Sequence, residues 1–179
     1  MDRVIILRYS EIHLKGKNRA FFENILKRNI IEKLKGINCR TEFYYGRYIV
    51  SDYDAESERE IVSRLKTVFG LYSLSAGLRT GADTDGIAEA AASICKSKGS
   101  FRVTASRADK TLPYTSVQLA TEIGGRMLEL HPGLTVDLHT PDFTIFIDVR
   151  DHATAYVYGE SVLCAGGMPV GSAGKGLSL

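Results

Sequence analysis

Hydrophobic and polar positions alternate in a way that divides residues 1–76 into six elements. Apolar side chains recur at helical spacing in two segments, and β-branched and aromatic residues dominate four shorter ones, two of which meet at Gly46 as in a hairpin. The order strand, helix, strand, strand, helix, strand predicts a ferredoxin-like α+β unit. The expected strands are 3–9, 39–45, 47–51 and 71–76, and the expected helices are 18–35, opened by Asn18 as N-cap, and 56–68.

The pattern begins again after a turn-rich stretch, 77–85, which we interpret as a domain boundary. Thr115 and Gln118 have the spacing of a capping box, and Gly124 on the following helix is expected to let a neighbouring element approach closely. The apolar face of that helix is predicted to consist of Val117, Ala120, Gly124, Met127 and Leu128. The expected elements are helix 84–98, strand 101–107, helix 115–130, and strands 134–138, 142–150 and 153–158.

The last residues lose this patterning. From Gly166 onward the chain has too many glycines for a packed element, so we interpret it as a linker. The sequence therefore predicts three parts: a ferredoxin-like domain at 1–76, a second α+β domain at 77–165, and a glycine-rich linker at 166–179.

Composition places the chain among ordinary globular proteins. It has 179 residues, of which 44% are hydrophobic and 25% charged, and no apolar run approaches the roughly 20 residues that cross a bilayer. The first seven residues are too broken by charge for a signal peptide, so we expect a cytoplasmic protein without membrane contact. Cys39, Cys95 and Cys164 lie too far apart to suggest a zinc site or a disulfide framework.

Positive charge gathers near the front of the chain. Residues 1–75 hold 14 Lys and Arg against 10 Asp and Glu, whereas residues 76–179 hold 9 against 11. Between Lys15 and Arg40, eight basic residues face only Glu23 and Glu32. Such a cluster favours an anionic partner.

Part of this charge falls at helical spacing. Lys17, Asn24, Arg28 and Lys35 would lie opposite the apolar face of the first helix, with Lys15 and Arg19 at its start. Such a stripe, taken alone, is more often a solvated surface than a binding site. A helix N-terminus adds partial positive charge and free N–H groups, which favours a phosphate ligand here.

A second basic group follows the strand expected at 101–107. Arg102, Arg107 and Lys110 lie at this strand and in the loop after it, where binding groups are commonly presented, although local pairing with Asp109 explains them equally well. Arg126 and Arg150 are further candidates.

Motifs for chemistry are missing. Gly174-Lys175 resembles the end of a phosphate-binding loop, but Pro169 stands where the first glycine belongs and Gly176 where the hydroxyl belongs. Lys175 is therefore interpreted as a linker residue able to contact an anionic partner. None of the four histidines has a sequence partner that suggests a catalytic triad or a metal site, so we assign no catalytic residue and no metal.

The stretch 7–26, LRYSEIHLKGKNRAFFENIL, resembles the opening of the tRNA 4-thiouridine synthetase family, the tRNA sulfurtransferases linked to thiamine biosynthesis. Similar family motifs are Gly46-Arg47, the loop Arg107 to Lys110, and the segments 136–142, 147–150 and 165–175. The resemblance covers essentially the whole chain. Ser10, Leu112 and Ser172-Ala173 depart from the usual family residues.

The resemblance implies a ferredoxin-like domain followed by a THUMP domain, which is an RNA-binding module. It also implies a following adenylating domain with an ATP loop and a sulfur-accepting cysteine, and the chain is expected to stop about where that loop begins. The full enzyme would use ATP and Mg²⁺, take persulfide sulfur from a cysteine desulfurase, and form 4-thiouridine at the eighth position of tRNA. The front domains would hold the acceptor stem and the CCA end, and a homodimer is plausible for the family.

Two other functions stay open at this point. The chain could be the THUMP module of another RNA-modifying enzyme such as a methyltransferase, although the segment after Gly166 looks like the sulfurtransferase connector. It could instead be a ferredoxin-like sensor or protein-interaction module whose basic surface is only solvated. On the first hypothesis the RNA-binding residues are Lys15, Lys17, Arg19, Arg28, Lys35, Arg102, Arg107, Lys110, Arg126, Arg150 and Lys175.

Overall fold

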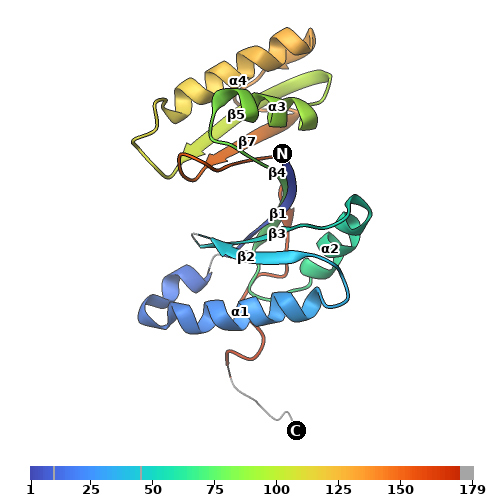
Figure 1. Cartoon of the computed structure of the whole chain (residues 1–179), viewed down its shortest axis with the longest axis vertical. Helices are drawn as coiled ribbons and strands as arrows, with labels where there is room; N and C mark the ends of the chain where they lie inside the picture. Colours follow the sequence, from blue (N-terminus) through green and yellow to red (C-terminus); the bar gives the residue numbers. More distant parts are fainter. Residues whose placement is uncertain (10, 45, 174–179) are drawn as a thin grey trace. The chain divides into compact units, whose positions relative to one another are not determined.

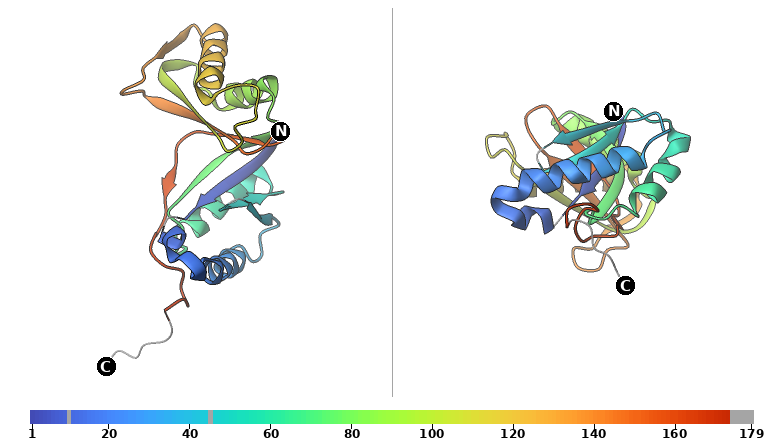
Figure 2. Two further views of the ribbon diagram at one scale, coloured as in Figure 1. Left: turned by 90° about the vertical axis from the view of Figure 1, so that its left-hand side faces the viewer. Right: turned by 90° about the horizontal axis from the view of Figure 1, so that it is seen from below.

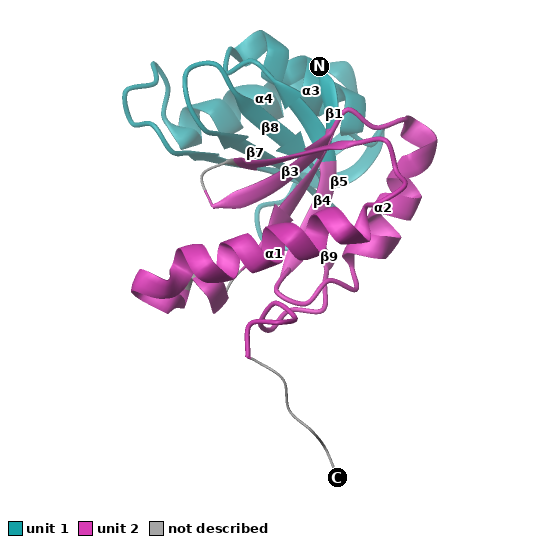
Figure 3. Cartoon of the chain, turned by 60° about the horizontal axis from the view of Figure 1, so that its bottom comes forward, with its two compact units in different colours: residues 1–3, 77–160 teal, residues 4–76, 161–179 magenta. Residues whose placement is uncertain are grey.

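The computed structural model describes residues 1–9, 11–44 and 46–173. It has two compact α+β units, which Figure 3 colours separately. The ferredoxin-like unit, magenta in Figure 3, consists of residues 4–76 and 161–179. The second unit in chain order, teal in Figure 3, consists of residues 1–3 and 77–160. Among the described residues, no helix is long and apolar enough to cross a membrane.

The ferredoxin-like unit has the predicted order of elements. Its strands pair in the order β2-β3-β1-β4, with β1 and β2 both antiparallel to β3, and two longer helices follow β1 and β3 (Figure 1). This confirms the ferredoxin-like prediction. The elements are β1 (Asp2–Arg8), η1 (Glu11–Asn18), α1 (Arg19–Lys33), β2 (Arg40–Tyr44), β3 (Arg47–Ser51), η2 (Ala55–Ser57), α2 (Glu58–Leu65) and β4 (Ser73–Thr80).

The core of this unit follows from the helical spacing in the sequence. Leu26 and Ile30 of α1 are fully buried with Ile61 and Leu65 of α2, in one cluster with side chains of β1 and β3. Phe22 lies at the edge of this cluster and is only partly buried. The predicted inward face of the first helix is therefore confirmed.

The first helix starts where it was predicted to start, but without the expected side-chain cap. α1 begins at Arg19 with Asn18 at the N-cap position, and the side chain of Asn18 makes no capping hydrogen bond. Before it, Glu11–Asn18 form a 3₁₀ segment that is kinked at Gly16, whose backbone (φ 49°, ψ −123°) is one that glycine tolerates best. The hydropathy spacing did not predict this 3₁₀ segment.

The second unit has two helices and a mixed sheet. Its strands run β4-β8-β7-β5-β6, with β5 parallel to β6 and β7, and β8 antiparallel to β7 and β4. This order matches the predicted helix, strand, helix and three strands. The elements are α3 (Thr84–Ile94), β5 (Lys98–Arg107), α4 (Ser116–Leu130), β6 (Gly133–Val136), β7 (Phe143–Val149) and β8 (Ala155–Tyr158).

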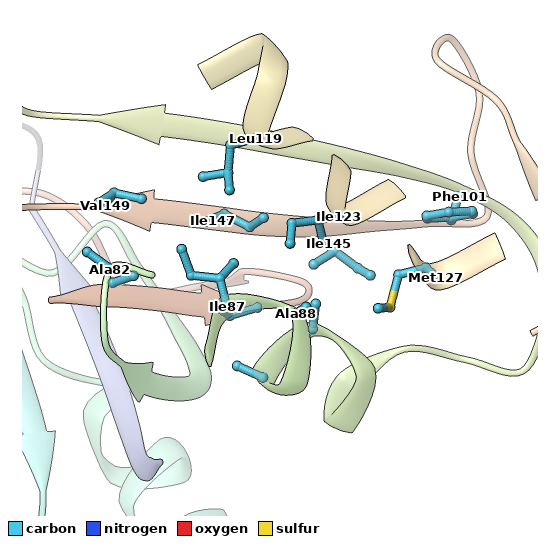
Figure 4. Close-up of a cluster of buried hydrophobic side chains, with 14 of the residues drawn as sticks. Ala82, Ile87, Ala88, Phe101, Leu119, Ile123, Met127, Ile145, Ile147 and Val149 are labelled. Carbon is cyan, nitrogen blue, oxygen red and sulfur yellow. The ribbon is translucent and has the colours of Figure 1, made fainter. Parts of the chain in front are cut away.

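The core of the second unit lies between its helices and its sheet (Figure 4). Ile145 and Ile147 of β7 pack with Ile123 of α4 and Ile87 of α3, and each is at most 1% exposed. The capping box predicted for α4 is present, since the Thr115 hydroxyl accepts from the Gln118 N–H and the Gln118 side chain accepts from the Thr115 N–H.

The buried face of α4 is rotated from the predicted one. Leu119, Ile123 and Met127 are buried, whereas Val117 is 75% exposed and Leu128 is 37% exposed. Gly124 was expected to permit a close approach, but an added Cβ would meet Val103 at an ordinary 3.9 Å. α4 carries apolar residues on two neighbouring stripes, so helical spacing alone did not identify the one that faces the core.

The glycine-rich segment is packed as far as the structure describes it. After β9 (Val162–Leu163) pairs with β4, the N–H of Gly70 donates to the Gly166 carbonyl, and Gly166 donates to Leu71, each at 2.7 Å. The orange and red segment in Figure 2 follows this course along the ferredoxin-like unit. Residues 161–165 therefore belong with the ferredoxin-like unit rather than with the second unit. Residues 166–173 are not the open linker that we predicted, because they are held by the backbone bonds of Gly166, by the bond from the Asn29 side chain to the Val170 carbonyl at 3.0 Å, and by the buried Pro169.

Candidate nucleic-acid interface

Two lysines at the start of α1 are exposed and have no carboxylate partner among the described residues. Lys15 and Lys17 lie in η1 on either side of the kinked Gly16. The segment η1 directly precedes the long helix α1, which is labelled in Figure 1. The Lys15 ammonium lies 5.4 Å from the centre of the Phe22 ring, a cation–π contact that leaves its charge unneutralised. We call residues 11–18 the lysine loop, and its two lysines can meet a phosphate without first breaking an ion pair.

The predicted stripe along the first helix is only partly formed. Asn24 and Arg28 are exposed one turn apart on α1, as expected, and Arg28 has no ion-pair partner among the described residues. Lys17 precedes the helix and Lys35 follows it, so the helical spacing that connected all four residues does not apply to them. Lys35 instead lies 3.8 Å from Glu32, an exposed pair that holds it only weakly.

Arg19 is the one candidate of this group that is firmly engaged. Its Nε donates to Glu23 at 2.7 Å, and its Nη2 donates to the Tyr9 hydroxyl at 3.1 Å. Tyr9 in turn donates to the same Glu23 carboxylate. Arg19 therefore stabilises the fold around the lysine loop, and most of its charge is compensated there.

The Arg107 to Lys110 loop of the second unit is folded around its own arginine. Arg107 Nη1 donates to the carbonyl oxygens of Lys110 at 3.1 Å and Leu112 at 3.4 Å. Asp109 accepts from the N–H and hydroxyl of Thr111, and these bonds hold the pKa of its carboxyl below the ordinary value. The Lys110 side chain is exposed and has no ionic partner among the described residues, so it is the part of this loop that is open to a ligand.

The other three candidate arginines of the second unit, Arg102, Arg126 and Arg150, are held by the protein. Arg102 donates to the Leu138 carbonyl at 3.0 Å. Arg126 of α4 bridges two carboxylates at 2.7 and 2.8 Å, those of Asp85 and Glu122. Arg150 lies 3.4 Å from Asp148, and both side chains are largely buried. The tertiary structure thus uses these residues as fixed ion pairs or backbone ligands, whereas Lys175 lies outside the described residues.

An apolar groove of about 640 Å³ runs between α4 and β5 in the second unit. β6 pairs with β5 only over Lys98–Phe101, so the groove borders the half of β5 that has no strand partner on that side among the described residues. Three hydroxyl-bearing residues, Thr104, Ser116 and Thr121, are among its lining residues. Its apolar lining includes Val117, Ala120, Leu128, Val136 and Leu138.

The groove contains four of the five residues that the sequence assigned to the core face of α4, and the fifth, Met127, is buried as predicted. We missed it as a surface feature because Val117, Ala120, Gly124 and Leu128 fit a buried stripe. The neighbouring stripe Leu119, Ile123, Met127 already supplies a complete core face. The sequence did contain a sign of the groove: a helix that packs on a single sheet needs one apolar stripe, and α4 has two.

The described residues offer little for covalent or metal chemistry. No three of the described His, Cys, Asp or Glu side chains lie together as metal ligands would. Burial raises the pKa of the Cys39 and Cys95 thiols, and raises that of Cys164 to about 11 against the opposing charge of Lys66. Thiols with raised pKa values are protonated at neutral pH and are poor nucleophiles.

Domain models match both units in order along the chain. Residues 4–75 match the ThiI ferredoxin-like domain, and residues 82–158 match the THUMP domain. The first match lies within the ferredoxin-like unit and the second match lies within the second unit. Residues 1–3 and 161–179 lie outside both matches.

Whole-chain comparisons agree with the domain models. The probable tRNA sulfurtransferases of Alkaliphilus oremlandii and Anoxybacillus flavithermus are 35% and 39% identical to the chain, and they cover 100% and 97% of it. A 4-thiouridine synthetase, solved as an RNA complex with bound ATP, is 31% identical over 96% of the chain, with a TM-score of 0.80. The chain spans about half the length of these relatives: 47%, 44% and 44%. It belongs to the tRNA sulfurtransferase family, as the part that holds the ferredoxin-like and THUMP domains.

Proposed function

We propose that this chain binds tRNA and serves as the tRNA-binding part of an enzyme that forms 4-thiouridine at the eighth position of tRNA. The observation that carries the proposal is the lysine loop, where Lys15 and Lys17 are exposed and unneutralised. Cations that need not break an ion pair are suited to phosphate contacts, which supply most of the affinity for nucleic acid. Family membership and the RNA in the solved complex of a relative support the same partner.

The two units would have different tasks on the tRNA. Lys15, Lys17 and Arg28 of the ferredoxin-like domain would contact backbone phosphates of the acceptor stem. The THUMP domain would receive the unpaired 3′ CCA end, with base faces against the apolar groove and base edges near its hydroxyls. Lys110 would contact a phosphate near that end.

The chemical step would use groups outside the described residues. ATP and Mg²⁺ require a phosphate-binding loop and oxygen ligands, and the described residues form neither arrangement. A cysteine desulfurase as sulfur donor, a homodimer and a cytoplasmic location are further parts of the same proposal, and they follow from the family.

A titration with two RNAs tests the proposal. We expect the chain to bind intact tRNA more tightly than the same tRNA without its four unpaired 3′ nucleotides, as measured by fluorescence anisotropy. Substituting Val117→Asp at the exposed rim of the groove should weaken binding to intact tRNA and leave binding to the shortened tRNA unchanged. Equal affinity for both RNAs would contradict the role of the groove, as expected for a sensor or protein-interaction module.

A second titration tests the lysine loop. The double substitution Lys15→Ala and Lys17→Ala should weaken binding to both RNAs and reduce the dependence of affinity on salt. The matched control is Lys66→Ala, which removes an exposed lysine elsewhere in the same unit. A result in which the double variant and the control behave alike would refute the assignment of phosphate contacts to this loop.

A further inference from the structure

A cluster of polar side chains connects the two ends of the lysine loop. Tyr9 lies two residues before the lysine loop in the sequence, and Arg19 immediately follows the loop. Both contact the carboxylate of Glu23: Tyr9 through its hydroxyl, and Arg19 through its Nε at 2.7 Å. Arg19 also donates to the Tyr9 hydroxyl at 3.1 Å, so the three side chains form a closed triangle.

The triangle is fixed to the core on one side. The Tyr9 ring is only 4% exposed, and it packs against Tyr48 with ring centres 6.0 Å apart. The Tyr48 hydroxyl donates to the Glu23 backbone carbonyl at 2.6 Å. Tyr48 belongs to β3, so the strand holds the helix at the residue to which both loop ends are attached.

The chemistry of the triangle argues against a direct role in RNA binding. Glu23 neutralises the Arg19 guanidinium, and a carboxylate in this position repels phosphate. Burial and the hydrogen bond to Glu23 raise the pKa of Tyr9 to about 12, which keeps its hydroxyl protonated and able to donate. The group therefore holds the chain in place and leaves the two lysines of the loop as its exposed cations.

Two side chains among the described residues of the loop make further contacts. Ile12 is fully buried, and Lys15 contacts the Phe22 ring. Gly16 adopts a backbone that allows a wide range of alternatives once its neighbours are released. Without the triangle, the lysines would sample many positions and would pay an entropic cost on binding.

We propose that Tyr9, Arg19 and Glu23 are positioning residues that hold Lys15 and Lys17 in the arrangement that binds tRNA phosphates. The inference rests on the proposed function, because it requires the lysine loop to contact RNA. It adds that the affinity of the lysines depends on the closed triangle, and that Tyr9 acts only through them.

The test substitution is Tyr9→Phe, which removes the hydroxyl and keeps the ring. Its matched control is Tyr53→Phe, since Tyr53 is also buried in the ferredoxin-like unit and also donates to a glutamate, Glu58, at 3.2 Å. Thermal melting followed by circular dichroism establishes that both variants fold. We expect Tyr9→Phe to weaken tRNA binding about 3- to 10-fold and to reduce the slope of log affinity against log salt by about one, whereas Tyr53→Phe changes neither.

A double-mutant cycle decides whether Tyr9 acts through the lysines. In the background Lys15→Ala, Lys17→Ala, the substitution Tyr9→Phe should have no further effect on tRNA affinity. An additive effect there, or a Tyr9→Phe variant that binds like Tyr53→Phe, would overturn the positioning role while leaving the lysine contacts intact. Unchanged binding on loss of both lysines would instead refute the lysine contacts of the proposed function, and the positioning role with them.

Discussion

The two basic loops of the molecule use the same residue types for different purposes. In the lysine loop, the arginine at one end is neutralised by Glu23, and Lys15 and Lys17 are left exposed. In the Arg107 to Lys110 loop, the arginine binds two carbonyl oxygens of its own loop, and only Lys110 is left. In both loops the arginine makes the fixed contacts and the lysines face solvent.

This difference has a physical basis. A guanidinium has five donors in a rigid plane, so it satisfies several carbonyl or carboxylate oxygens at once. An ammonium is a strongly hydrated point charge on a flexible stem, and it loses less by remaining in water. A count of positive charges therefore overestimates the binding surface of this chain wherever the charges are arginines with internal partners.

The largest loss of stability is expected where an arginine and its carboxylate partner are both largely buried. Arg150→Ala should lower the free energy of unfolding by about 3 kcal/mol, because it leaves the Asp148 carboxylate, 2% exposed, without this cation. Urea unfolding followed by far-ultraviolet circular dichroism measures the loss. Lys17→Ala is the control and should cost less than about 0.5 kcal/mol. Equal stability of the two variants would contradict the division between structural arginines and exposed lysines.

Two substitutions within a single loop sharpen the comparison. Arg107→Ala should destabilise the second unit by about 2 kcal/mol, because the carbonyl groups of Lys110 and Leu112 lose a charged donor. Lys110→Ala should leave stability unchanged and weaken tRNA binding. Hydrogen exchange of residues 107–112, together with tRNA titration, separates the two effects. Faster hydrogen exchange in the Lys110→Ala variant would contradict the division of roles between Arg107 and Lys110. Exchange in the Arg107→Ala variant that is no faster than in the unsubstituted chain would contradict it too.

Elements of the fold could be predicted where short-range chemistry decides them. The Thr115–Gln118 capping box depends on two residues that are close in sequence, and it is present. The kink at Gly16 could not be predicted, because it lies in the short 3₁₀ segment Glu11–Asn18, outside the helix whose hydrophobic period the sequence shows. The packing of Gly166 depends on backbone hydrogen bonds, which hydropathy does not register.

The candidate site was predictable only in part. The sequence located the basic residues, but whether a cation is exposed depends on partners that are distant in the chain. Arg126 pairs with Asp85, which lies 41 residues earlier. Lys15 and Lys17 have no such partner among the described residues. The distinction between these cases is a property of tertiary contacts, and it reduces the eleven predicted residues to a smaller set.

Salt dependence tests that smaller set directly. Loss of Lys15 and Lys17 together should reduce the slope of log affinity for tRNA against log salt by roughly two, one for each phosphate contact. Arg126→Ala should leave the slope unchanged, because Asp85 and Glu122 already compensate its charge. Titrations at four or more salt concentrations give the slopes. A reduction for Arg126→Ala as large as for one lysine would remove the distinction between paired and unpaired cations.

The smallest effect concerns the triangle that closes the lysine loop, and it is visible at alkaline pH. The pKa of Tyr9 is raised from 10.0 to about 12, so the unfolded chain loses this proton at lower pH than the folded chain. The stability that the protonated Tyr9 hydroxyl contributes is fully present below pH 10, and the free energy of unfolding should fall as pH rises from 10 to 12. Tyr9→Phe removes this contribution, so its melting temperature should decline less steeply over that window than that of the unsubstituted chain. Tyr53→Phe is the control, and a decline just as shallow in that variant would show that the alkaline sensitivity does not originate at Tyr9.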